Sequence, residues 1–174
     1  KEMADYAEEV LSELREWATS PTEGGKETKD WDADKAEFAK LAGGWLISKL
    51  GGVMAEHKID IRILKVTPEN FAELLTLIHQ KKVTGTNALV ILTEMAMSGA
   101  DPSIIMQEKN LSSIEDASEL AVIAGNVVVA NPKVVEDWKG GKANAIQFLV
   151  GQMMKATHGK APPETARKLI EAEL

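Results

Sequence analysis

The sequence predicts an all-α fold, on three observations. Apolar residues recur every three or four positions through most of the 174 residues, which is the period of an amphipathic helix. Helix-start signals such as Thr67-Pro68-Glu69 precede several of these stretches. No two neighbouring stretches show alternating apolar and polar residues on either side of a turn, which is the pattern of paired strands.

The first part of the chain predicts two helices with an irregular loop between them. Tyr6, Val10, Leu14 and Trp17 form a stripe that predicts a helix over residues 2–18. Residues 19–34 mix Ser, Pro, Gly and charges without an apolar period, so they predict a loop. We therefore treat residues 1–33 as an N-terminal helix and loop. A second helix is expected over residues 34–57, with a weak point at the Gly51-Gly52 pair and with these apolar positions inward: Phe38, Leu41, Trp45, Ile47 and Leu50.

In the middle of the chain, sequence signals for helix starts and helix ends predict several further helices. Thr67 is expected to cap one helix, and another spans residues 84–98 until Gly99 ends it in a left-handed cap. Asp101-Pro102 starts a short helix. Ser112 and Glu115 have the spacing of a capping box and predict the start of the next helix, which runs through Val127-Val128-Val129. Together these elements predict a helical domain over residues 34–130.

The last third of the chain predicts a small separate domain over residues 131–174, with a boundary near Ala130. Three short helices are expected there, over residues 132–138, 142–157 and 162–173. The fold prediction is thus a helical domain followed by a three-helix bundle.

The composition limits the classes of function. A formal charge of −7 and a pI near 5.1 argue against binding of nucleic acid by the whole chain. The absence of cysteine excludes disulfides, thiolate nucleophiles and cysteine metal sites. No apolar run approaches the roughly 20 residues that span a bilayer, and the acidic start does not resemble a signal peptide. We expect a soluble cytoplasmic protein without a membrane partner, and the first residue, Lys1, suggests a piece of a longer one.

The charge balance reverses in residues 139–168, which predicts a local polyanion-facing surface. One acidic residue, Glu164, stands there among six basic ones: Lys139, Lys142, Lys155, Lys160, Arg167 and Lys168. Within this segment Gly140-Gly141-Lys142 allows two interpretations. The free amides of a helix start could hold a phosphate together with Lys142, or Gly140 could end one helix while Gly141 makes the turn.

No catalytic or metal site is predicted. The three histidines, His57, His79 and His158, are far apart in the sequence, and no spacing typical of a metal site occurs. The Gly140-Gly141-Lys142 element lacks the spacing of a P-loop, and no serine stands in a nucleophile elbow.

Several stretches together resemble a known family. They are Asn131-Pro132-Lys133, Asp137 to Lys142, Phe148 to Lys155 and Thr157 to Lys160, with a weaker likeness through Ala42 to Leu46 and through Thr67 to Asn131. The chain resembles the C-terminal part of GatB, the B subunit of the aspartyl/glutamyl-tRNA(Asn/Gln) amidotransferase, whose tail domain is shared with the YqeY family. It departs from that pattern at Gly44, at Trp138, where tyrosine is usual, and at Pro162.

This resemblance implies a helical linking domain followed by a YqeY-like tail bundle. It also implies that the parent enzyme converts Glu-tRNA(Gln) or Asp-tRNA(Asn) to Gln-tRNA(Gln) or Asn-tRNA(Asn), using ammonia from a glutaminase subunit. The ATP and magnesium chemistry would lie in a catalytic domain that is not in this sequence. The region itself would be non-catalytic and would hold tRNA(Gln) or tRNA(Asn), while the A and C subunits of the amidotransferase assemble through the parent protein.

The resemblance also suggests roles for particular residues. Those expected to face the tRNA are Lys139, Gly140, Gly141, Lys142, Lys155 and Lys160. Those expected to hold the tail bundle together are Pro132, Trp138, Phe148, Leu149 and Met153. A hinge near Ala130 would let the bundle follow the tRNA. Two other classes remain open, namely a helical protein-interaction module without direct RNA contact and a small enzyme acting alone on aminoacyl-tRNA.

Overall fold

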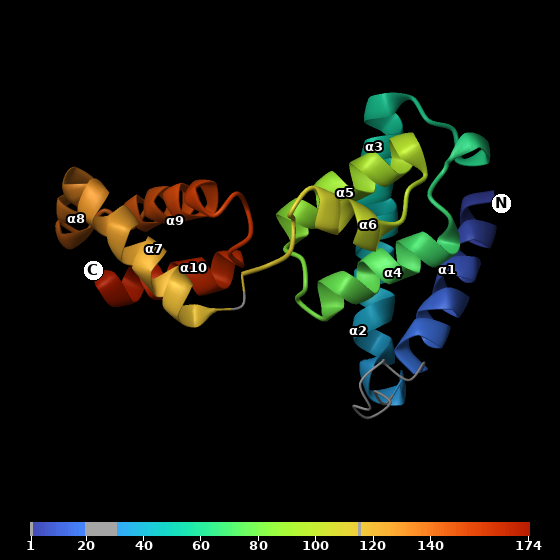
Figure 1. Cartoon of the computed structure of the whole chain (residues 1–174), viewed down its shortest axis with the longest axis horizontal. Coiled ribbons are helices and arrows are strands. Elements are labelled where there is room, and N and C mark those ends of the chain that lie inside the picture. Colours follow the sequence, from blue (N-terminus) through green and yellow to red (C-terminus); the bar gives the residue numbers. More distant parts are fainter. Residues whose placement is uncertain (1, 20–30, 115) are drawn as a thin grey trace. The chain divides into compact units, whose positions relative to one another are not determined.

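The computed structural model describes residues 2–19, 31–114 and 116–174, which form helices joined by turns (Figure 1). These residues contain no β-strand, so the predicted all-α fold is confirmed. The chain divides into two compact units, Lys1–Asn110 and Leu111–Leu174. Each unit has its own apolar core and is described separately.

The first unit is built on the packing of its first helix against the middle of the chain. Its elements are α1 (Glu2–Thr19), α2 (Trp31–Gly44), the π-helical η1 (Trp45–Leu50), α3 (Gly51–His57), the 3₁₀ turn η2 (Ile61–Ile63), α4 (Pro68–His79), α5 (Gly85–Ser98) and α6 (Pro102–Glu108). Helix α1 lies against α4, and Val10 and Leu14 are fully buried. The hydroxyl of Tyr6 donates a hydrogen bond of 3.1 Å to the carbonyl oxygen of Val66. Helix α1 is therefore part of this unit, and the predicted loop after it lies largely outside the described residues.

The predicted helix ends in the middle of the chain are confirmed by their hydrogen bonds. Thr67 Oγ1 accepts from the amide of Asn70 at 3.1 Å, and Thr84 Oγ1 accepts from that of Asn87 at 3.3 Å. Gly99 has φ +80° and donates its amide to Met95 O at 2.8 Å. The two threonine side chains satisfy amides that the first turn of a helix leaves without partners, and the amide of Gly99 satisfies a carbonyl oxygen at the end of α5.

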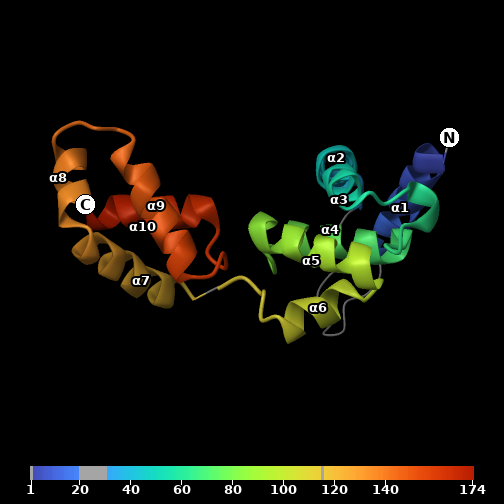
Figure 2. The ribbon, with the colours of Figure 1, turned by 90° about the horizontal axis from the view of Figure 1, so that it is seen from above.

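Elements α2, η1 and α3 form one continuous rod, upright in Figure 1 and seen nearly end on in Figure 2. The helix does not break at Gly51. Instead, it passes through the π-helical segment, in which each hydrogen bond spans one residue more than in an α-helix. The wider turn changes which side chains face inward, so Trp45 and Leu46 are both buried while Ile47 is 83% exposed. The prediction that Ile47 faces the core is therefore wrong.

The second unit consists of α7 (Ala117–Ala130), α8 (Pro132–Lys139), α9 (Ala145–Ala156) and α10 (Pro163–Glu173). Helix α10 packs against both α7 and α9. Figure 2 shows the loop that joins α8 to α9. The core is formed by Leu120, Ala124, Val127, Ile146, Leu149, Met153, Ala161, Ala166 and Ile170.

The division between the units falls twenty residues before the predicted boundary near Ala130. Helix α7 contributes Leu120, Ala124 and Val127 to the core of the second unit, which is why it belongs there. The predicted start of this helix is also different, because Asp116 rather than Ser112 is its cap. The Asp116 carboxylate accepts from the hydroxyl of Ser118 at 2.5 Å and from the amides of Ser118 and Glu119 at 2.8 and 3.3 Å, and these bonds, that of the hydroxyl most of all, lower the pKa of the carboxyl group.

No single helix among those described is long and apolar enough to cross a bilayer. Two bent helix pairs, α5 with α6 and α7 with α8, reach that criterion by length and composition.

A buried carboxyl group lies between α4 and α6. Glu73 is only 8% exposed, and Ser103 Oγ donates a hydrogen bond to its Oε1. Burial raises the pKa of Glu73, and the nearby carboxylate of Asp101 raises it further, whereas the bond from Ser103 acts in the opposite direction. The folded chain therefore holds this proton more tightly than the unfolded chain does.

We predict that Glu73→Gln stabilises the first unit at neutral pH. The stability that wild-type Glu73 contributes is fully present below its unfolded pKa and is lost as the pH rises through its raised folded pKa. A neutral amide avoids that loss and can still accept the bond from Ser103, so we expect a higher free energy of unfolding at pH 7 and little change at pH 4. Urea unfolding at pH 4 and pH 7 measures it, with Glu56→Gln, at an exposed position on α3, as the control. An equal effect of Glu73→Gln at both pH values would contradict this account.

Candidate nucleic-acid interface

The Gly140-Gly141 turn closes on its own backbone. The amides of Gly140, Gly141 and Lys142 donate to carbonyl oxygens of the preceding helix, those of Glu136, Trp138 and Asp137, at 2.8, 2.9 and 3.0 Å. Gly141 has φ +89°, and α9 begins only at Ala145. These amides already have partners and are not free to hold a phosphate, which favours the turn interpretation of the two.

Two of the six basic residues in this segment are paired with acidic residues. Lys142 Nζ lies 2.7 Å from Asp137 Oδ1, and Arg167 Nε lies 2.9 Å from Glu171 Oε1. Both acidic partners lie just outside residues 139–168, so counting charge within that segment missed them. The Lys142–Asp137 pair is exposed, and exposed pairs contribute at most about 1 kcal/mol. Lys142 can therefore exchange this partner for another anion.

Lys139, Lys155 and Lys160 make no ion pair with the residues that the structure describes. The first two are exposed and the third is partly buried. Lys139 ends α8, close to Lys142, whereas Lys155 lies in the last turn of α9 and Lys160 follows that helix. Helix α9 has 12 residues and is thus about 18 Å long. The predicted site is therefore two groups of lysines at opposite ends of α9.

The C-terminal end of α9 is fixed by a compact turn. Thr157 Oγ1 donates to Met153 O at 3.0 Å and accepts from the amide of Ala161 at 3.3 Å. The amide of Gly159, at φ +74°, donates to Met154 O at 2.8 Å. The carbonyl of Lys160 accepts from the amide of Ile114 at 3.1 Å, which ties this turn to the segment before α7.

The residues expected to hold the tail bundle together divide into two groups. Leu149 and Met153 are fully buried, and Trp138 packs against the core, as predicted. Pro132 is exposed at the start of α8, and Phe148 is 49% exposed. Phe148 occurs among apolar neighbours in the sequence. Because Leu149 points into the core, the side chain of Phe148 faces solvent. The prediction that Pro132 and Phe148 form the core is wrong.

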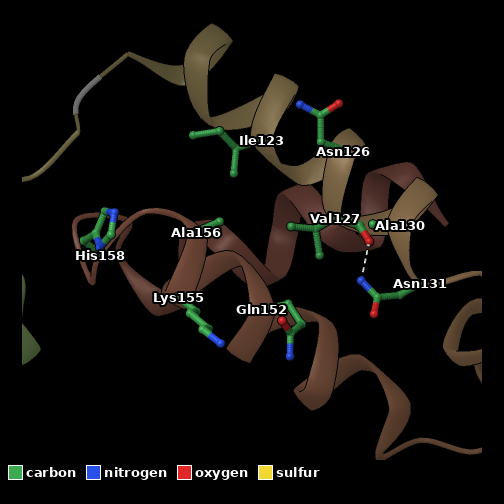
Figure 3. Close-up of a pocket in the computed structure, with 9 residues that line it drawn as sticks. All are labelled: Ile123, Asn126, Val127, Ala130, Asn131, Gln152, Lys155, Ala156 and His158. Atoms are coloured by element: carbon green, nitrogen blue, oxygen red, sulfur yellow. Dashed lines mark hydrogen bonds between the residues drawn. The ribbon is translucent and has the colours of Figure 1, made fainter.

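A groove between α7 and α9, which sequence reasoning missed, lies next to Lys155 (Figure 3). It has a volume of about 550 Å³ and is lined by Ile123, Asn126, Val127, Ala130, Asn131, Gln152, Lys155, Ala156 and His158. Asn131 Nδ2 donates to Val127 O at 2.8 Å on one wall. The sequence shows no signal for the groove, since it depends on how α7 and α9 pack in three dimensions.

Metal-ligating side chains do not gather in the described part of the chain, where no three His, Asp or Glu residues lie together in a way that could hold an ion. The arrangement is thus one of cations, amides and apolar side chains along α9. Such a surface can bind, through charge and shape, a partner that carries negative charge.

Comparison with known proteins identifies the family. The GatB domain matches residues 31–174, which span α2 to the end of α10. The chain belongs to the GatB domain family. It is 42% identical over 136 residues to the B subunit of the aspartyl/glutamyl-tRNA(Asn/Gln) amidotransferase of Symbiobacterium thermophilum, a match that covers 78% of the chain and 28% of the relative.

Other relatives carry the same name. The B subunit of Methanopyrus kandleri is 37% identical over 169 residues, with 97% of the chain and 35% of the relative covered. That of Lactobacillus helveticus is 38% identical over 152 residues, with 86% and 32% covered. The chain thus spans about a third of the length of these curated relatives, and the GatB domain makes up most of it.

The turn at Gly141 gives a prediction about the GatB domain. A Cβ at this position would meet no neighbouring atom within 4 Å, but its φ of +89° is unfavourable for any residue with a side chain. Gly141→Ala should therefore destabilise the second unit by about 1 kcal/mol. Thermal unfolding measures the loss. Gly140→Ala is a less clean comparison, because a Cβ there would lie 3.3 Å from Glu136 O. Unchanged stability of Gly141→Ala would show that the turn adjusts without strain.

Proposed function

We propose that this chain is the tRNA-holding C-terminal region of an amidotransferase B subunit. The parent enzyme would convert Glu-tRNA(Gln) to Gln-tRNA(Gln) or Asp-tRNA(Asn) to Asn-tRNA(Asn). The observation that carries the proposal is the GatB domain match over residues 31–174, together with relatives whose names include the two tRNAs. The local excess of basic residues over 139–168, six against one acidic residue, gives that segment the charge that a tRNA contact requires.

The proposed contact uses both ends of α9. Lys139 and Lys142 would meet phosphates at one end, with Gly140 and Gly141 presenting a turn that no large side chain covers. Lys155 and Lys160 would meet phosphates at the other end. Contacts about 18 Å apart would follow the surface of a folded RNA, and binding by phosphates alone reads shape rather than sequence.

We place catalysis elsewhere in the parent protein. The chemistry would need ATP and magnesium, held by a part of the subunit outside this sequence, and the A and C subunits would join through that parent. The region would act in the cytoplasm by positioning tRNA. Turnover of misacylated tRNA by this chain alone would contradict its proposed non-catalytic role.

An apolar groove favours a second function, that of a helical protein-interaction module without direct RNA contact. The groove, of about 590 Å³, lies in the first unit between α1 and the rod formed by α2 and η1. Ile47, at 83% exposed, and Leu11, at 41% exposed, lie on it among small residues. Exposed apolar surface of this kind is typical of protein contacts.

The deciding measurement is tRNA binding by the 174-residue chain over a salt series. Wild type should bind tRNA(Gln) or tRNA(Asn) with micromolar or weaker affinity, and log affinity should fall linearly with log salt. Lys155→Glu should weaken binding about tenfold and reduce the salt slope by about one, and Lys142→Glu should weaken it less, because Lys142 already pairs with Asp137. Lys49→Glu, at an exposed position on η1, is the matched control and should leave binding unchanged.

Two results would count against the proposal. If the folded wild-type chain binds no tRNA at low salt, direct RNA contact by this region is wrong and the protein-interaction function is favoured. If wild type binds but neither reversal on α9 weakens binding, the region contacts RNA through another surface.

A further inference from the structure

Gly151 occupies a position on α9 that nothing inside the protein requires to be glycine. It lies in the middle of the helix at an exposed position, and a Cβ there would meet no atom within 4 Å. Its φ is not positive, so the backbone also admits other residues. Because glycine weakens a helix interior relative to alanine, glycine at this position lowers the stability of the folded chain. A partner that approaches the helix backbone closely would explain it.

The residues around Gly151 indicate what kind of partner that is. At 3.6 residues per turn, Phe148 and Lys155 project within about 60° of Gly151, opposite the buried Leu149 and Met153. Helix α9 carries no acidic side chain. Phe148, 49% exposed, offers a flat apolar ring on the same face as the ammonium group of Lys155. An aromatic ring and a cation on one face, about two helical turns apart, can hold an unpaired base and a phosphate close to it.

The groove between α7 and α9 continues this face on the side of Gln152. In Figure 3, Gln152 and Lys155 extend from α9 on the same side, and Ile123 and Val127 come from α7. The side chains of Gln152 and Lys155 make no hydrogen bond or ion pair with other described residues. The volume of about 550 Å³ lies in the range of pockets for small ligands. Polar groups without partners beside an apolar wall suit a ligand with a flat ring and polar edges.

We propose that this groove and the outer face of α9 bind one unstacked nucleotide of the tRNA and the backbone next to it. The base lies against Ile123 and Val127, its edge meets the amide of Gln152, and its phosphate meets Lys155. The adjoining ribose-phosphate backbone crosses Gly151, and Phe148 stacks on the neighbouring base. This inference rests on the proposed function and adds a contact with an unpaired base to one that lysines alone would make to phosphates.

Gly151→Ala separates this contact from a structural role. We expect the variant to melt a few degrees higher, because alanine favours the helix, yet to bind tRNA at least about fivefold more weakly, because its methyl group obstructs the backbone. Gly52→Ala is the matched control, since Gly52 is also exposed in a helix with no atom within 4 Å of its Cβ. The control should gain stability without losing RNA affinity.

The base contact is tested by chemical probing of the tRNA bound to the full chain. Wild type should protect one unpaired base, and Gln152→Ala should lose that protection while Lys155-dependent binding persists. Phe148→Leu should weaken binding by about 5–100-fold, the range for loss of one stacked base.

The outcomes distinguish this inference from the proposed function. No tRNA binding by wild type would refute both. Binding that Lys155→Glu weakens but Gly151→Ala leaves intact would refute only the inference, as would protection confined to phosphates or a Gly151→Ala variant that loses stability and binding together. A protein partner on this face would also leave RNA binding by Gly151→Ala unchanged.

Discussion

The burial of one stripe of α9 sets the geometry of the whole candidate interface. Ile146, Leu149 and Met153 are at most 2% exposed and pack with residues of α7 and α10. Burying a side chain of this size contributes about 1.5–3 kcal/mol, so the three together fix the rotation of the helix. The opposite face, with Gly151 and Lys155, is therefore presented to solvent in one orientation. The interface needs no movable loop, because the core of the second unit already positions it.

The sequence is a good guide where local chemistry decides the structure. The cap at Thr67, the helix start near Thr84 and the left-handed Gly99 depend on hydrogen bonds within a few residues, and all three were predicted correctly. Failures occur where rotation about a helix axis matters. Phe148 and Ile47 both lie in apolar stretches, and the order of residues in such a stretch does not show which side chain points into the core. At Ile47 a π-helical turn rotates the side chain toward solvent. At Phe148 the neighbouring Leu149 is fully buried, so the Phe148 ring lies on the outer side of the helix.

The candidate site was predictable in its charge and not in its geometry. The excess of lysine is a property of composition, but its separation into two groups follows from the length of α9. The pairing of Lys142 with Asp137 depends on a turn that brings residues five apart together. The groove beside Gln152 depends on contacts among helices, and the amides of the glycine turn prove to be occupied. Position along the chain thus identified cations but could not show which of them have acidic partners.

The pairing of Lys142 also bears on how a site of this kind can be specific. An exposed lysine-carboxylate pair is weak, and salt screens it as it screens a phosphate contact. A phosphate that displaces Asp137 must compete with it, so the net gain at Lys142 is smaller than at Lys155, which has no acidic partner among the described residues. The end of α9 that carries Lys155 is also the end with the groove and the unpaired amide of Gln152, whereas Phe148 lies about two turns earlier, in the first half of the helix. We therefore propose the base contact at that end, with Lys139 and Lys142 orienting the RNA along the helix.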